Sequence, residues 1–98
     1  MYIGAMEFDL LLGDVRSLKE KRSALRPVLE ALRRCDVSVA EVGDRDVYRR
    51  ARVGVAVTSG DAEHCSQVLD RCERLVAGRP EMELLSCGRR IFALSDGE

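Results

Sequence analysis

Aromatic residues are scarce in this chain of 98 residues, which has no tryptophan and only four aromatic side chains: Tyr2, Phe8, Tyr48 and Phe92. RNA-recognition sheets commonly stack bases on an aromatic pair on their central strands, and no such pair can be identified here. Positive charge is not in excess either, because 16 Lys and Arg against 17 Asp and Glu leave a net charge of −1. Non-specific nucleic-acid binders usually carry a strong positive excess, so only a local basic patch remains available for such contacts.

Metal-binding and catalytic patterns are missing as well. The four cysteines form no C-x-x-C pair, and the one histidine, His64, adjoins Cys65. Adjacent helical residues do not face each other, so no Cys–His dyad is predicted, and zinc spacing is absent. Cys65 and Cys72 share an apolar helical stripe, which favours packing over redox chemistry. With no glycine-rich phosphate loop present, we expect no catalytic residue, no metal and no cofactor, and reduced, mostly buried thiols.

Long apolar runs are absent too, so no membrane-spanning segment is predicted. Met1 leads directly into strand-like sequence without a signal-peptide pattern, and reduced thiols fit the cytoplasm. A hydrophobic content of 46% with 34% charged residues is typical of a folded globular protein. We therefore expect one cytoplasmic domain that spans residues 1–98.

Period-two alternation predicts the strands. In the first strand an apolar face alternates with a wetter one, as in a half-buried strand. Gly88 is a candidate bulge in the last strand, and a tail follows at residues 95–98. The predicted strands are residues 2–12, 37–42, 52–58 and 82–94.

Apolar residues at helical spacing predict two helices, over residues 17–35 and from about Asp61 to Gly78. Pro27 falls inside the first and predicts a kink. The order β-α-β-β-α-β predicts an α+β, ferredoxin-like fold: a four-stranded antiparallel sheet with two helices on one face.

The start of the first predicted helix combines a capping pattern with a cluster of cations. Ser17 and Glu20 have the spacing of a capping box. Cations are disfavoured at the positive end of a helix dipole, and a helix start that tolerates them can hold an anion. The cations are Arg16, Lys19, Lys21, Arg22 and Arg26.

Lys21 differs from the others because it projects into the apolar sector of the helix. A structural ion pair is predicted for it, with Glu41 or Asp9 as the partner. The stripe of Lys19, Arg22, Arg26 and Arg33 has two interpretations: a solvated helix face, or a surface for phosphate or an acidic partner.

The densest charge lies in residues 41–52, between the two middle strands. Tyr48 beside Arg49 and Arg50 resembles a small nucleic-acid contact, because an aromatic ring can stack on a base while arginine binds phosphate. The alternative is that Tyr48 packs over its own loop. Asp44 and Asp46 would weaken a phosphate site.

An ordered set of short segments resembles the YlxP-like family of small bacterial proteins of unknown function. These segments span nearly the whole chain: Ser17–Arg22, Val37–Val42, Arg50-Ala51, Gly54–Val57 and Leu69-Asp70. The resemblance implies a ferredoxin-like fold, a cytoplasmic protein, and genes often near those of ribosome maturation and translation initiation, hence an association with RNA or the ribosome. The family has no agreed activity or catalytic residues, and Tyr48 stands where a tryptophan is common.

We therefore predict a non-enzymatic domain that associates with RNA or a ribosomal subunit. One alternative is a self-associating structural or regulatory module, in which the open sheet face or an edge strand pairs in a homodimer. Another is a small-anion-binding domain. The predicted contact residues join the helix start to the hairpin segment: Arg16, Ser17, Lys19, Lys21, Arg22, Arg26, Tyr48, Arg49 and Arg50.

Overall fold

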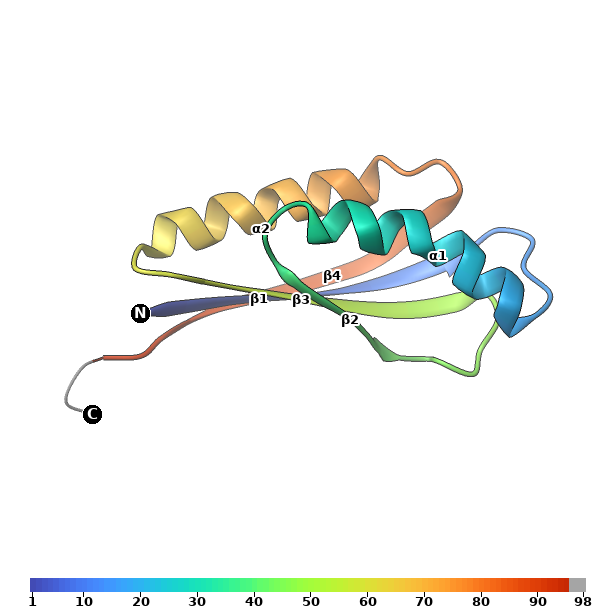
Figure 1. Cartoon of the computed structure of the whole chain (residues 1–98), viewed down its shortest axis with the longest axis horizontal. Helices are drawn as coiled ribbons and strands as arrows, with labels where there is room; N and C mark the ends of the chain where they lie inside the picture. The colour runs from blue at the N-terminus through green and yellow to red at the C-terminus, as the bar shows by residue number, and fades with distance from the viewer. Residues whose placement is uncertain (96–98) are drawn as a thin grey trace.

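The computed structural model describes residues 1–95, and Figure 1 shows a sheet with both helices on one face. The four strands pair antiparallel in the order β2-β3-β1-β4. This arrangement confirms the ferredoxin-like fold predicted from the sequence. The elements are β1 (Tyr2–Leu12), α1 (Leu18–Arg33), β2 (Ser38–Gly43), β3 (Arg50–Ser59), α2 (Ala62–Ala77) and β4 (Met82–Ala93).

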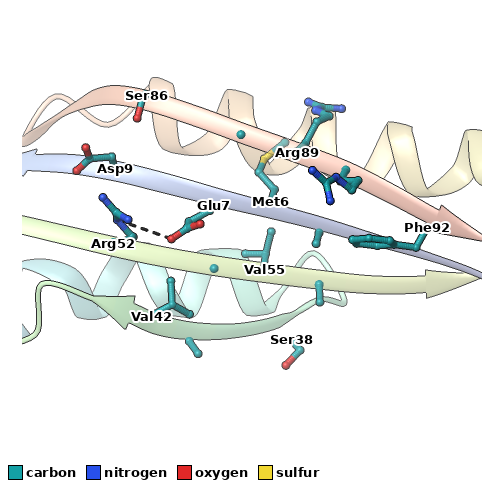
Figure 2. A pocket seen from close by; sticks show the side chains of 16 residues that line it. Met6, Glu7, Asp9, Ser38, Val42, Arg52, Val55, Ser86, Arg89 and Phe92 are labelled. Atoms are coloured by element: carbon teal, nitrogen blue, oxygen red, sulfur yellow. Dashed lines mark ion pairs between the residues drawn. The ribbon is translucent and has the colours of Figure 1, made fainter.

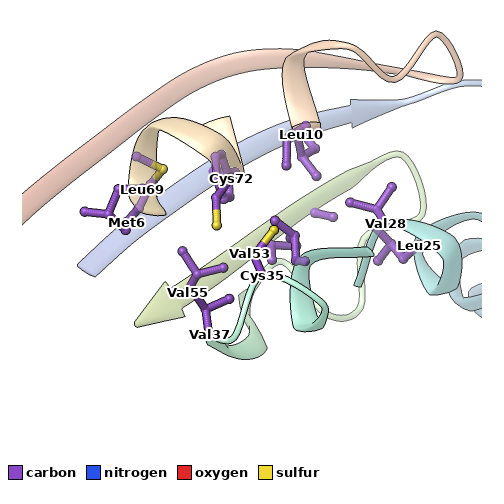
Figure 3. Packing of buried hydrophobic residues seen from close by; sticks show 14 of the residues in the cluster. Met6, Leu10, Leu25, Val28, Cys35, Val37, Val53, Val55, Leu69 and Cys72 are labelled. Carbon is purple, nitrogen blue, oxygen red and sulfur yellow. The ribbon is translucent and has the colours of Figure 1, made fainter. Parts of the chain in front are cut away.

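Buried and more exposed residues alternate along the central strands β1 and β3, and the buried ones form the core. Met6 and Leu10 of β1 and Val53 of β3 point toward the helices and are buried. Figure 3 shows these side chains in one layer with Leu25 of α1 and Leu69 of α2. Burying one side chain of this size stabilises a protein by about 1.5–3 kcal/mol, so this layer holds the helices on the sheet.

Side-chain caps define where both helices begin. Ser17 is the N-cap of α1, and Asp61 caps α2 by accepting a hydrogen bond from the N–H of Glu63 at 2.9 Å. α1 is shorter than predicted and ends at Arg33, because the N–H groups of Cys35 and Asp36 donate to carbonyl oxygens three residues back instead of four. Asp36 then takes a left-handed conformation with φ of 60°. Pro27 is exposed and α1 continues through it.

The structure corrects the predicted start of the third strand. β3 begins at Arg50 rather than at residue 52, because Arg50 and Ala51 pair with Leu11 and Leu10 of β1. Arg50 is therefore a strand residue and not part of the preceding loop.

The predicted bulge at Gly88 is also wrong. Gly88 pairs in regular register with Glu7, and the register shifts at Leu85 instead, between Leu84 and Ser86. β4 is thus one continuous strand with an irregularity near its start. Residues 96–98 of the predicted tail lie outside the described residues.

No helix among residues 1–95 combines the length and the apolar character that crossing a lipid bilayer requires.

Candidate functional site

Lys21 holds the β2–β3 loop (residues 44–49) against the first turn of α1. Its side chain is only 2% exposed, and Nζ donates hydrogen bonds to the carbonyl oxygens of Asp44 and Val47, at 2.5 and 2.7 Å. Nζ also lies 3.0 Å from a carboxylate oxygen of Glu41. A buried ammonium needs such partners, since burial without them is costly. The predicted ion pair of Lys21 is confirmed with Glu41 as the partner, whereas Asp9 pairs elsewhere.

The cap of α1 differs slightly from the predicted capping box. Ser17 Oγ accepts a hydrogen bond from the N–H of Glu20 at 3.1 Å, as predicted. The Glu20 carboxylate reaches one residue further back than expected and accepts from the N–H of Arg16 at 2.6 Å. The Arg16 side chain pairs with Asp14 at 3.2 Å. Arg16 and Ser17 are therefore both engaged within the protein.

Arg49 fastens the same loop to the end of β1. Its carbonyl oxygen accepts from the N–H of Leu12 at 2.7 Å, and its Nε donates to the carbonyl oxygens of Leu12 and Gly13, at 3.3 and 3.0 Å. In Figure 1 the β1–α1 connection, the start of α1 and the β2–β3 loop lie at the same end of the molecule. The two segments predicted to form a contact surface are thus brought together.

Exposed cations and one aromatic ring occupy this end. Within residues 1–95, no carboxylate forms an ion pair with Lys19, Arg22, Arg26 or Arg45. Tyr48 is 47% exposed. The acidic neighbours are Asp14, Glu20, Asp44 and Asp46. We define the basic end as Lys19, Arg22, Arg26, Arg45, Tyr48 and Arg49.

Arg45 was not predicted. It lies between Asp44 and Val47, the two residues whose carbonyl oxygens bind Lys21. The sequence signal that could have found it is its position in the same charged loop as Tyr48.

Two predicted contact residues are directed away from the basic end. Lys21 points inward, as described, and Arg50 lies on the sheet face opposite the helices. Nη2 of Arg50 contacts both carboxylate oxygens of Asp9, at 2.9 and 2.7 Å. These hydrogen bonds and the negative charge of Asp9 raise the pKa of the Arg50 guanidinium. Arg50 thus has a carboxylate partner already.

The face of the sheet opposite the helices, which we call the open face, carries a shallow groove that the sequence did not reveal. The groove has a volume of about 760 Å³. Figure 2 shows Glu7, Arg52, Val42 and Phe92 around it. Small residues form its floor, and they come from all four strands: Ala5, Ala40, Gly54, Ala56 and Gly88.

A bulge in β2 shapes one wall of this groove. The register of β2 with β3 shifts between Glu41 and Gly43, which leaves Val42 as the extra residue. Its side chain lies over Gly54, where a Cβ would be 3.0 Å from Val42 Cγ1. At Gly88 a Cβ would meet no heavy atom within 4 Å, so the groove is open there.

All four cysteines are free thiols, and only Cys87 is exposed. Burial raises the pKa of the Cys72 thiol to about 11, and partial burial of the Cys87 thiol together with the charge of Glu73 raises the pKa of Cys87. A high pKa disfavours the thiolate, which is the reactive form. Among residues 1–95, no three His, Cys, Asp or Glu side chains gather as metal ligands do.

Comparisons with known proteins agree with the resemblance found in the sequence. A family model described as "Protein of unknown function (DUF503)" matches residues 3–89. The chain is 32% identical over 82 residues to the uncharacterized protein YlxP of Bacillus subtilis (strain 168), a match that covers 83% of this chain and 89% of that protein.

Two solved structures share the fold. The de novo designed protein Foldit4 is 13% identical with a TM-score of 0.55, and the match covers 97% of this chain and 100% of the design. LFR1 1, a de novo designed protein with a ferredoxin fold, is 11% identical with a TM-score of 0.50, over 100% of this chain and 91% of the design. At such identities the likeness concerns the fold alone.

Proposed function

The chain belongs to the DUF503 family of proteins of unknown function, and from its own residues we propose that it is a non-enzymatic, cytoplasmic domain that binds RNA, free or in a ribosomal subunit, through the basic end. The observation that carries this proposal is the position of Lys21. One buried ammonium holds the β2–β3 loop on the start of α1, so that cations from two distant segments lie at one end.

The chemistry of this end suits an unpaired stretch of RNA. Arginine presents a planar fork of donors that fits phosphate oxygens, and Arg22, Arg26 and Arg45 have no carboxylate partner within residues 1–95. Tyr48 leaves about half of its surface free for a base to stack on. The resemblance to the YlxP-like family, with its association with translation genes, points in the same direction.

A salt titration tests the phosphate contacts. We expect the affinity of the wild type for a single-stranded RNA and for purified ribosomal subunits to fall steeply with salt, because phosphate neutralisation releases counterions. The double variant Lys19→Gln, Arg22→Gln removes two cations, and each contact to single-stranded RNA contributes about 0.7 to the slope of log affinity against log salt. We therefore expect the slope to fall by about 1.4.

The matched control is Arg71→Gln with Arg74→Gln. These two residues are exposed on α2, share the same spacing, and lie outside the basic end. This control removes the same charge from the protein and should leave the slope nearly unchanged. If the salt slope falls equally in both double variants, the overall charge of the protein, and not the basic end, governs binding.

Tyr48→Ala tests the stacking contact separately. The loss of one base–aromatic stack should weaken binding by about 1 kcal/mol with an unchanged salt slope, because stacking releases no counterions. Wild-type protein that binds neither RNA nor ribosomal subunits at low salt would end the proposal.

A further inference from the structure

On the open face, residues that lie opposite one another on the four strands form rows across the sheet. Small residues dominate two neighbouring rows, and the groove runs across them (Figure 2). The first row is Ser38, Ala56, Ala5 and Arg90, and the second is Ala40, Gly54, Glu7 and Gly88, each given in the order β2, β3, β1, β4.

On the two central strands of this face the acids and the arginines are separated, and Arg90 lies apart from them on β4. The acids Glu7 and Asp9 lie on β1, and the arginines Arg50 and Arg52 lie on β3. Arg52 and Glu7 are only loosely paired, with 3.7 Å between Nε and the carboxylate oxygen, and both side chains are about half exposed. Arg50 binds Asp9 across the midline at 2.7 Å, whereas Arg52 is the loosely held arginine, so acids on β1 lie beside arginines on β3 along the midline.

We propose that the open face binds the open face of a second copy of this chain, with a two-fold axis along the strands at the midline between β1 and β3. Such an axis places β1 of each copy over β3 of the other. In the row of Arg52 and Asp9, each arginine then faces the aspartate of its partner copy. Two-fold contacts of this kind need a self-complementary surface, and this division of charge supplies one.

Side-chain size fits the same arrangement. The axis also places β2 of one copy over β4 of the other, so that the short side chain of Ala40 faces the open space at Gly88. Ala56 faces Ala5 of the other copy near the axis, where two short side chains let the sheets approach. Packed sheets stay within about 30° of alignment, which keeps these rows opposite each other.

A second copy suits this face better than RNA does. Glu7 and Asp9 lie at its centre and would repel phosphates, while an apolar groove that carries charges of both signs suits a protein partner. The pairing would leave the basic end free, so this inference is independent of the proposed function.

Sedimentation over a wide range of protein concentration tests the dimer. We expect the wild type to associate, and Ala56→Arg to weaken the association at least tenfold, because a long charged side chain holds the two faces apart. The control is Ala77→Arg, the same substitution at an exposed position of α2 outside the face. Circular dichroism should show both variants folded. A wild type that stays monomeric at its solubility limit overturns the proposal, as does equal association of the two variants.

A mixing experiment tests the two-fold register itself. In a dimer of Arg52→Glu two acids face each other at each contact, and in a dimer of Asp9→Arg two arginines do, so each variant alone should be mainly monomeric. Asp9→Arg also removes the ion pair with Arg50 of its own chain, so circular dichroism should show that this variant is folded. An equimolar mixture should regain dimers, because position 52 of one variant then pairs with position 9 of the other. Tyr48→Ala should leave wild-type association unchanged, since Tyr48 lies at the basic end. Association of either variant alone, or no gain on mixing, refutes this register.

Discussion

Lys21 of α1 and Glu41 of β2 form an ion pair 3.0 Å long in which the lysine is buried and the glutamate is 21% exposed. The pair joins a helix to an edge strand, and the same ammonium binds two carbonyl oxygens of the loop that follows. The sequence predicted a structural ion pair for Lys21 and also placed it among the contact residues, and the ion pair is the role that its observed contacts serve.

Lys21→Met should lower the free energy of unfolding by about 2–3 kcal/mol, less than the full cost of breaking a wholly buried pair because Glu41 keeps some contact with water. Urea denaturation measures this loss. Hydrogen exchange at the N–H of Val47, which donates to Asp44, should quicken as the loop is released. The exposed Lys19→Met is the control and should change stability by less than about 0.5 kcal/mol. Equal losses in the two variants would contradict the anchoring role.

Ser17→Ala should destabilise the protein by about 1 kcal/mol, because the N–H of Glu20 loses its acceptor. Chemical denaturation should show a lower midpoint with the same slope. Ser23→Ala places the same change at an exposed position inside α1, where alanine is the better helix former, so its stability should be equal or slightly higher. A midpoint unchanged in Ser17→Ala would argue against the cap.

Thiol labelling should distinguish Cys87 from the three buried cysteines. In the native, reduced protein we expect one reactive thiol, and four after denaturation. Because burial and Glu73 raise the pKa of Cys87, its labelling should be slower than that of free cysteine near neutral pH, and Glu73→Gln should speed it. Cys87→Ser should abolish native labelling. Rapid labelling of two or more native thiols, or bound zinc in purified protein, would contradict this assignment.

Alkaline pH should destabilise the fold through Cys72. Its pKa is about 11 in the folded protein against 9.0 ordinarily, so the unfolded chain releases its proton first as the pH rises. The stabilising contribution is complete below pH 9 and is lost between pH 9 and 11, on the order of 2 kcal/mol. Denaturation at several pH values measures it. Between pH 9 and 11 the free energy of unfolding should fall less in Cys72→Ala than in the wild type. Equal falls in the two proteins would show that the Cys72 thiol is not the cause.

Gly88→Ala and Gly54→Ala should differ in their effect on stability, although both glycines lie in one row of the open face. At Gly88 the new methyl meets open space, so reduced flexibility of the unfolded chain should stabilise the monomer by about 0.5–1 kcal/mol. At Gly54 the methyl meets Val42, which must move, and that gain should be absent. Adding Val42→Ala to Gly54→Ala should restore it, and a double-mutant cycle measures the coupling. Equal effects of the two single variants would contradict the contact.

The fold could be predicted from the sequence because its signals are local. Alternation in β1 and the apolar stripe of each helix are set by neighbouring residues, and Ser17 and Asp61 mark helix starts. Pairing is not local, so the extension of β3 to Arg50 and the bulge at Leu85 were missed.

The candidate site was predicted in part for the same reason. Clustered cations in the sequence indicated the basic end, and helical periodicity placed Lys21 on the inner side of α1. The open-face groove depends on which residues stand opposite one another on four strands. Glu7, Gly54 and Gly88 share a row only once the register is known.

The contact between Val42 and Gly54 also constrains how this sequence can change over time. A larger residue at position 54 is compatible with this sheet only where position 42 carries a smaller one or the bulge in β2 is lost. The two positions should therefore covary among the proteins of the family, as a joint substitution rather than two independent ones. Position 88 has no such neighbour, so packing within the monomer does not restrict the residue there. If the family keeps a small residue at position 88, the restriction must come from whatever occupies the groove.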